Sequence, residues 1–221
     1  MYHKIVKNII YPLSDKFLGL SINENLKKNR TIQWFSKKEL RSIQNKKLYA
    51  ILSHCKKNIP YYKTILKNSN FDWRGDPFQE LKKIPTLTKK HISKNLPNNL
   101  IDKKRNIYTI EKTSGSSGEQ GEFYLDREAF SKIIAAQTLY WEWAGYSFGK
   151  KAIQTGINPE RGLKKHLKDR LLLIKYADAF RIDLKMVEKN LSSFRNKKEI
   201  FFIGYPSSIF SYAKFAKDLG I

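Results

Sequence analysis

The chain has 221 residues, of which 41% are hydrophobic and 13% aromatic, a composition that supports a packed core and excludes a globally disordered polypeptide. It carries 43 lysines and arginines against 20 aspartates and glutamates, a formal net charge of +23, and its apolar runs are far shorter than the roughly 20 residues of a membrane-spanning helix. The single cysteine, Cys55, excludes an internal disulfide, and no cysteine or histidine spacing predicts a metal site.

Residues 1–100 are predicted to be mostly helical, with irregular connections. Apolar residues between Leu40 and Lys57 approximate a helical stripe, and Pro60 ends it because a residue that precedes proline disfavours helical backbone. Thr88 can cap a further short helix. The N-terminal sequence MYHKIVKNIIYPLSDKFLGL lacks the apolar core and the small-residue cleavage site of a signal peptide, so we expect a cytoplasmic protein.

Residues 101–156 combine β-forming residues with a loop that is rich in glycine and serine. Asp126 is a good N-cap for the helix that follows, and Gly145 is a good stop for it. The predicted elements, in order, are a strand at 107–110, a loop from Ser114 to Gly121, a strand at 123–125, a helix from Asp126 to about Ala144 and a strand at 151–156.

The last part of the chain alternates strands and helices. We expect strands at 170–176 and 199–203, and helices at about 184–194 and 207–219. Such alternation predicts right-handed crossover units and a sheet with parallel strands. The predicted fold class is therefore α/β, with a mostly helical region at 1–100 and an α/β nucleotide-binding region at 101–221.

The segment TSGSSG, from Thr113 to Gly118, is the most informative motif of the sequence. Its glycines let the backbone approach a ligand closely, and a loop of this kind can turn several amide groups toward an anion. Its four hydroxyl side chains add hydrogen bonds to phosphate oxygens, each worth roughly 1.5–3 kcal/mol when the acceptor is charged. No lysine follows the final glycine, so the segment is not a GxxxxGK[ST] phosphate loop. A hairpin turn chosen only for flexibility is the alternative interpretation.

TSGSSG also resembles the phosphate-binding motif of adenylate-forming enzymes, which usually reads TSG, two serines or threonines, then glycine. Further segments resemble, in the same order, the phenylacetate–CoA ligase-like branch of this AMP-binding superfamily, which includes the CapK-type capsular polysaccharide biosynthesis proteins. The resemblance covers about residues 40–221. The segments are LYAILSHCKKNIPYYKTIL, LKKIPTLTKKHISKN, NIYTIEKTSGSSG, YWEWAGYSFGKKAIQTG and FFIGYPSSIFSYAKFAKDLGI.

The resemblance implies an ATP-dependent ligase reaction. A carboxylate attacks the α-phosphorus of ATP in the presence of Mg²⁺, and an acyl acceptor then captures the activated acid. The expected partners are therefore a nucleotide and a small carboxylic acid or acyl acceptor. The family's motif assigns the β- and γ-phosphates to six residues, which are Thr113, Ser114, Gly115, Ser116, Ser117 and Gly118.

Two departures from the family pattern keep a second hypothesis open. Relatives place proline, often with lysine, after the last motif glycine, whereas Glu119 and Glu122 stand near that point here. Relatives are also about twice as long, and their adenine-binding segment, ribose-binding aspartate and catalytic lysine follow the part represented by this chain. The chain is then expected to be an incomplete adenylation domain, and the alternative is a catalytically inactive remnant or one half of a split enzyme that a second chain completes.

The positive charge supports a third hypothesis, a basic module that binds nucleic acid or an anionic membrane. The lysines are scattered as pairs along the chain instead of gathered in one tail, which favours a solvated surface. We therefore expect no specific nucleic-acid partner and at most peripheral membrane contact.

A second candidate site follows the last predicted strand. Tyr205 and Pro206 come after its carboxyl end, where open α/β sheets bind ligands, so they are candidates for an acyl pocket. The four histidines lie in unrelated segments, and Cys55 lies on an apolar helix stripe, which favours packing over nucleophilic chemistry. No catalytic residue is assigned from the sequence, and no metal ligand.

Overall fold

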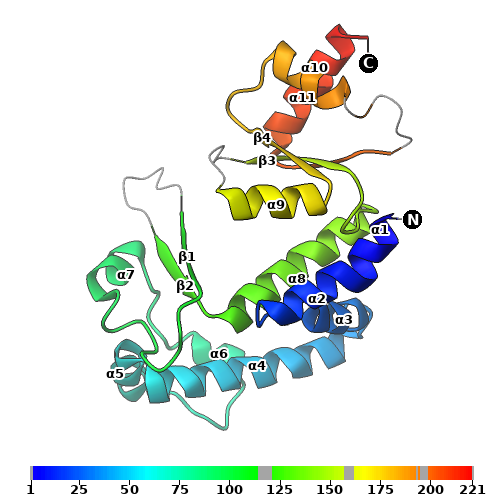
Figure 1. Cartoon of the computed structure of the whole chain (residues 1–221). Coiled ribbons are helices and arrows are strands. Elements are labelled where there is room, and N and C mark those ends of the chain that lie inside the picture. The colour runs from blue at the N-terminus through cyan, green and yellow to red at the C-terminus, as the bar shows by residue number, and fades with distance from the viewer. Residues whose placement is uncertain (1, 114–120, 157–161, 193, 195–198, 221) are drawn as a thin grey trace. The chain divides into compact units, whose positions relative to one another are not determined.

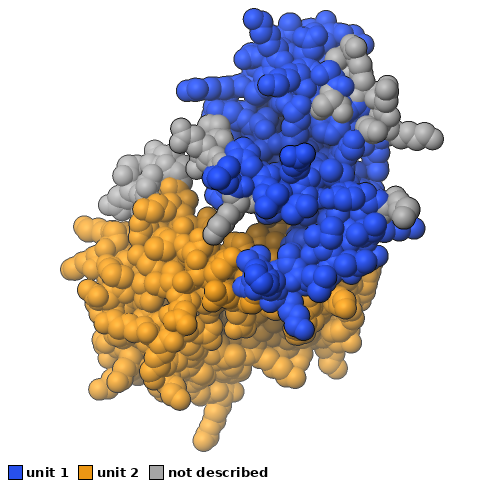
Figure 2. All heavy atoms as spheres, viewed as in Figure 1, with its two compact units in different colours: residues 1–18, 138–221 blue, residues 19–137 orange. Residues whose placement is uncertain are grey.

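The computed structural model describes residues 2–113, 121–156, 162–192, 194 and 199–220 (Figure 1). The chain forms two compact units, which Figure 2 shows in different colours. Unit 1 consists of residues 1–18 and 138–221, and unit 2 consists of residues 19–137. The boundary between the units falls inside one helix, α8 (Arg127–Trp143). The predicted division of the chain into two regions at residue 100 stays a prediction.

Unit 2 consists of helices, an antiparallel hairpin and the first part of α8. Ser36 and Glu39 form a capping box at the start of α4, and Pro60 is the first residue of α5, where its missing amide hydrogen costs nothing. The elements are α3 (Ile22–Ile32), α4 (Lys37–Asn58), α5 (Pro60–Asn68), α6 (Pro77–Leu81), α7 (Lys89–Asn95), β1 (Thr109–Lys112), β2 (Glu122–Leu125) and the first part of α8 (Arg127–Trp143).

The core of the helical part of unit 2 lies between α4 and α5. Leu52 of α4 and Leu66 of α5 are buried against Phe71, and partly buried aromatic side chains close the cluster. The prediction that this region is mostly helical is confirmed, and Pro60 does end the preceding helix as expected. Thr88 caps α7 by accepting a hydrogen bond from the His91 amide, at a donor–acceptor distance of 3.3 Å.

Unit 1 opens with a continuous helix, formed by α1 (Tyr2–Ile5), the π-helical turn η1 (Val6–Ile10) and α2 (Tyr11–Phe17). Its inner face packs against the C-terminal part of the chain, because Val6 is completely buried in a cluster with Tyr146 and Phe148. Tyr11 stacks on Phe148 with ring centroids 3.9 Å apart. The N-terminal helix is therefore part of the α/β unit.

A three-stranded parallel sheet forms the centre of unit 1. Its strands are β3 (Ala152–Gly156), β4 (Ile174–Asp178) and β5 (Phe201–Ile203), in the order β4-β3-β5. The helices of this part are α9 (Leu163–Leu171), α10 (Leu184–Ser192) and α11 (Pro206–Asp218). Figure 1 shows α10 and α11 on one face of the sheet and α9 on the other. The predicted α/β class and parallel sheet are confirmed.

Side chains of the strands alternate between two buried clusters. Ile153 of β3 packs with Val187 of α10 and Tyr212 of α11 on one face. Its neighbour Ala152 joins the cluster of Val6 on the opposite face. This alternation is expected from the two-residue period of a strand, and it explains why the neighbouring residues Ala152 and Ile153 are both apolar.

The predicted strand at 170–176 is displaced. The structure places Arg170 and Leu171 in helix α9, and β4 begins only at Ile174. Leu173 has a φ of +57° at the turn between the two elements. A short apolar run fits a buried helix end and a buried strand equally well, so the sequence pattern could not separate them. Among the described residues, no helix has the length and hydropathy needed to cross a membrane.

Candidate functional site

The β1–β2 hairpin holds the two ends of the TSGSSG loop together. The strands pair antiparallel, with Lys112 opposite Glu122 at the end of the ladder. One step further, the Thr113 amide donates a hydrogen bond to the Gly121 carbonyl at 2.9 Å, and the Gly121 amide donates to Thr113 Oγ1 at 2.8 Å. Thr113 therefore fixes the base of the loop. The remaining motif residues, Ser114–Gly118, lie outside the described part of the chain.

Glu122 is turned toward its own hairpin. Its carboxylate forms an ion pair with Lys112 Nζ at 2.8 Å and accepts a hydrogen bond from the Tyr124 hydroxyl at 3.0 Å. The hydrogen bond from Lys112 holds the pKa of Glu122 below its usual value. The negative charge of Glu122 is thus paired at the base of the loop, which reduces the repulsion that this departure from the family pattern would otherwise cause.

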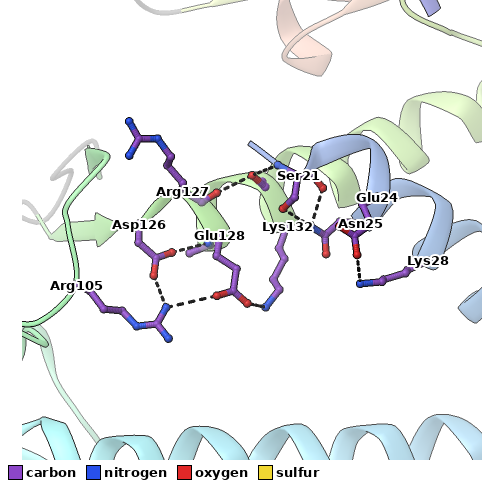
Figure 3. Close-up of polar contacts among 11 residues, drawn as sticks. Ser21, Glu24, Asn25, Lys28, Arg105, Asp126, Arg127, Glu128 and Lys132 are labelled. Carbon is purple, nitrogen blue, oxygen red and sulfur yellow. Dashed lines mark hydrogen bonds and ion pairs between the residues drawn. The ribbon is translucent and has the colours of Figure 1, made fainter. Parts of the chain in front are cut away.

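A polar network fixes the start of α8, directly after the hairpin (Figure 3). Asp126 accepts a hydrogen bond from the Ala129 amide at 2.7 Å, so it is the N-cap that the sequence predicts. The Arg105 guanidinium bonds to the other oxygen of Asp126 and lies 3.5 Å from Glu128. Arg105 therefore ties the chain before β1 to the helix after β2. Burial raises the pKa of Asp126, but the hydrogen bonds from Ala129 and Arg105 outweigh burial and hold the pKa below its usual value.

Removing this cap is expected to destabilise the protein. Asp126→Ala should lower the free energy of unfolding by about 1–2 kcal/mol, because the first turn of α8 loses its acceptor. Asp126→Asn keeps a capping oxygen but loses the charge, and therefore should cost less. Because the folded-state pKa is depressed, the ionic contribution is complete above the ordinary carboxyl pKa and disappears as the pH falls through the lowered value.

Denaturant unfolding of both variants and the wild type tests this prediction across the acid range. The difference between wild type and Asp126→Asn should shrink as the pH falls below about 4. A difference that is the same at neutral and acid pH would show that the Asp126 charge does not contribute.

The carboxyl ends of the parallel strands form a second position of interest. The chain runs from β3 to its neighbour β4 and then crosses to β5, which lies on the other side of β3. The direction of the connections therefore reverses between β3 and β5. Open α/β sheets bind ligands at such a reversal. Here Thr155 of β3 lies against Gly204, which follows β5, so closely that a Cβ on Gly204 would overlap Thr155 Oγ1.

Tyr205 and Pro206 begin helix α11 at this edge. Tyr205 is the N-cap residue with its side chain 46% exposed, and Pro206 occupies the first turn. Ser208, also in the first turn of the helix, donates a hydrogen bond to the Ala179 carbonyl at 3.3 Å. The Ala179 amide in turn donates to the Gly156 carbonyl at 2.9 Å. These bonds tie the end of β3, the segment after β4 and the start of α11 into one edge.

The sequence-predicted site residues thus fall into two groups. Thr113 belongs to unit 2, whereas Tyr205 and Pro206 belong to unit 1. Arg105 and Thr155 are not part of any sequence motif. Only the structure shows that Arg105 bonds to Asp126 and that Thr155 lies against Gly204. Thr155 Oγ1 is buried, and within the described ranges it has no hydrogen-bond partner.

Two residues considered in the sequence analysis, Cys55 and His54, lie in helix α4. Cys55 is partly buried in α4, and burial raises the pKa of its thiol. His54 Nε2 lies 3.2 Å from Asp102, and its ring contacts Asn58 at 3.1 Å. Within the described part of the chain, no group of three acidic, histidine or cysteine side chains could hold a metal ion.

Comparisons with known proteins agree with the proposed resemblance in sequence and in fold. No family model matches the chain. Protein CapK of Staphylococcus aureus is 29% identical over 118 residues, which are 53% of this chain and 26% of CapK. The open conformation of 2-hydroxyisobutyryl-CoA ligase, solved in complex with 2-HIB-AMP and CoA, superposes with a TM-score of 0.55. This match has 15% identity and covers 85% of this chain and 45% of the ligase.

The chain therefore spans about a quarter of the length of CapK and under half of the ligase. The structural match shows that the chain has the fold of part of this CoA ligase, and the sequence match shows similarity to part of CapK. Both agree with the expected resemblance to the N-terminal portion of an adenylate-forming, AMP-binding enzyme.

Proposed function

We propose that the chain holds ATP as a substrate in a CapK-like, carboxylate-activating ligase. The observation that carries this proposal is that the TSGSSG motif connects β1 to β2, with the two strand ends joined through Thr113, in a hairpin directly before the capped helix α8. The adenylate-forming fold and the similarity to CapK support it.

In this proposal, Thr113 orders the entry and exit of the loop. The amides and hydroxyls of residues 114–118 would then hold the β- and γ-phosphates. The bound nucleotide would be accompanied by Mg²⁺, which neutralises phosphate charge and uses phosphate oxygens among its ligands. Lys112 keeps the Glu122 carboxylate paired, so it removes one source of repulsion from the approach of a polyphosphate.

Tyr205 and Pro206 are proposed to border the pocket for the acid. Their position after the carboxyl end of β5 and the exposure of the Tyr205 ring support this role. The acid that they contact would be activated on ATP and passed to an acyl acceptor. From the resemblance to CapK-type proteins, we further propose a role in capsule or surface polysaccharide biosynthesis and a cytoplasmic location.

A surface on α9 supports completion of the fold by further protein. Leu163, Leu167 and Leu171 recur every four residues along this helix, and they are 89%, 61% and 42% exposed. A leucine row of this kind is the apolar stripe of a helix that packs on a neighbour. We propose that the remaining part of the adenylate-forming fold, in the same or a second chain, packs there.

Nucleotide binding by the purified chain tests the proposal directly. Mg²⁺-ATP binding measured by calorimetry should be weakened by about 100-fold or more in Ser116→Ala/Ser117→Ala, because two hydrogen bonds to a charged phosphate are lost. Ser93→Ala/Ser211→Ala is the matched control, since both serines bond only to carbonyls of their own helices. Equal affinity of both variants for Mg²⁺-ATP would refute a phosphate-binding role for the motif.

Turnover requires the rest of the fold and separates the alternatives. Supplying a C-terminal portion from a CapK-like protein should give carboxylate-dependent exchange of pyrophosphate into ATP. Binding of Mg²⁺-ATP without exchange across a broad panel of acids would instead support the catalytically inactive remnant.

A further inference from the structure

The continuous N-terminal helix α1–η1–α2 presents a row of apolar side chains to solvent. Ile9, Leu13 and Phe17 are 54%, 63% and 91% exposed, and Ile5 precedes them at the same four-residue spacing. The π-helical turn lowers the rotation per residue between Val6 and Ile10, which keeps this row aligned along the helix. Figure 1 shows α1 and α2 following one another along one rod.

This row is separate from the face that packs into the core of unit 1. Val6 is fully buried, and Ile10 and Tyr11 pack against the same cluster. The helix therefore has an inner apolar face that holds it to the fold and an outer apolar row that the described residues leave exposed. Single exposed apolar side chains are common, but a row at helical spacing marks a surface that binds something.

Lysines accompany the exposed row. Lys4, Lys7 and Lys16 are exposed on this helix, and Lys7 also lies 3.9 Å from Glu142. The helix has one acidic residue, Asp15, and this side chain is buried. The outward charge of the helix is thus positive, in agreement with the net charge of +23 of the chain.

We propose that α1–η1–α2 is an interfacial helix that docks on the surface of an anionic lipid bilayer. Exposed Ile, Leu and Phe beside lysines on one helix is the chemistry of helices that lie in the plane of a membrane interface. The row enters the boundary between headgroups and acyl chains, and the lysines pair with anionic headgroups. Nucleic acid is a poorer match, because a phosphate backbone gives Leu13 and Phe17 no apolar surface to cover.

Vesicle co-sedimentation of the full chain tests this proposal. The chain should sediment with vesicles of equal parts phosphatidylglycerol and phosphatidylcholine, and much less with vesicles of phosphatidylcholine alone. Ile9→Ser/Leu13→Ser/Phe17→Ser should reduce the partition coefficient by about tenfold or more, since three apolar side chains no longer leave water. Lys4→Gln/Lys16→Gln should reduce it by about fivefold per lysine, and added salt should do the same to the wild type.

Two further variants make the result specific to the helix. Phe180→Ser/Phe210→Ser removes two exposed rings elsewhere in unit 1, 76% and 71% exposed, and should leave vesicle binding unchanged. Leu13→Trp should show a blue shift of its fluorescence when anionic vesicles are added, which a purely electrostatic contact would not produce. Circular dichroism confirms that each variant is folded.

The proposal is overturned by equal binding to both kinds of vesicle, or by binding that the serine variant retains. It is also overturned if the wild type fails to bind vesicles but forms dimers that the serine variant loses, because the row would then be a contact between two copies. Retention of an oligonucleotide by wild type and serine variant alike, without vesicle binding, would assign the basic surface to nucleic acid instead.

Discussion

Gly149→Ala is expected to lower the free energy of unfolding by about 4 kcal/mol, because the new Cβ would meet the N-terminal helix. Gly149 has a φ of +84°, and a Cβ built there would lie 2.7 Å from Val6 Cβ and 2.9 Å from His3 Cα. The cost combines a left-handed backbone that alanine disfavours with displacement of a backbone atom that cannot move alone. Thermal and denaturant unfolding measure the loss.

Gly145→Ala is the matched control, since Gly145 has a φ of +83° but the nearest atom to its Cβ lies 3.7 Å away. This variant should show only the backbone cost, about 1–2 kcal/mol. Limited proteolysis should cut Gly149→Ala, and not Gly145→Ala, within the first 18 residues. Equal losses in the two variants would show that Gly149 does not hold the helix in place.

Gly204→Ala is the second substitution with a large expected effect, a loss of about 3 kcal/mol in the free energy of unfolding. The added methyl would overlap Thr155 Oγ1 and approach Thr155 Cβ to 3.1 Å, at the edge where β3 and β5 end. Thr155 is only 6% exposed, so its side chain has no free space into which it can turn. The sheet edge below Tyr205 should therefore open or unfold.

A double-mutant cycle with Thr155→Ala tests the cause. Thr155→Ala alone should be almost neutral, because the loss of a buried methyl is offset by removal of a hydroxyl that lacks a hydrogen-bond partner among the described residues. The double variant should recover about 2 kcal/mol of the loss caused by Gly204→Ala. Strict additivity of the two substitutions would place the cost of Gly204→Ala elsewhere.

The sequence predicted most of the elements because their local signals are strong. Asp126 before an apolar-periodic segment marked the start of α8, and Thr88 marked α7, and both caps are present. The alternation after residue 150 predicted the parallel sheet. Helix α9 was missed because six of its nine residues are charged or histidine and its leucines are exposed. The apolar run at its end therefore blended with that of β4.

Candidate site residues could be predicted only where a motif marks them. The TSGSSG segment identified the hairpin loop, and the structure adds that Thr113 closes its base. The link from Arg105 to Asp126 could not be read from the sequence, because an arginine in a basic chain has no local pattern. The contact between Gly204 and Thr155 joins positions far apart in the chain, which only the sheet order brings together.

The assembly of unit 1 from two distant parts of the chain affects the order of events during synthesis. Val6 and Tyr11 are made early, but their packing partners Tyr146 and Phe148 leave the ribosome only after all of residues 19–137. At roughly 5–20 residues per second, translation leaves both faces of the first helix uncovered for on the order of ten seconds. During that interval the helix is open to chaperones and to the bilayer, so its delivery to a membrane can begin before the unit to which it belongs has folded.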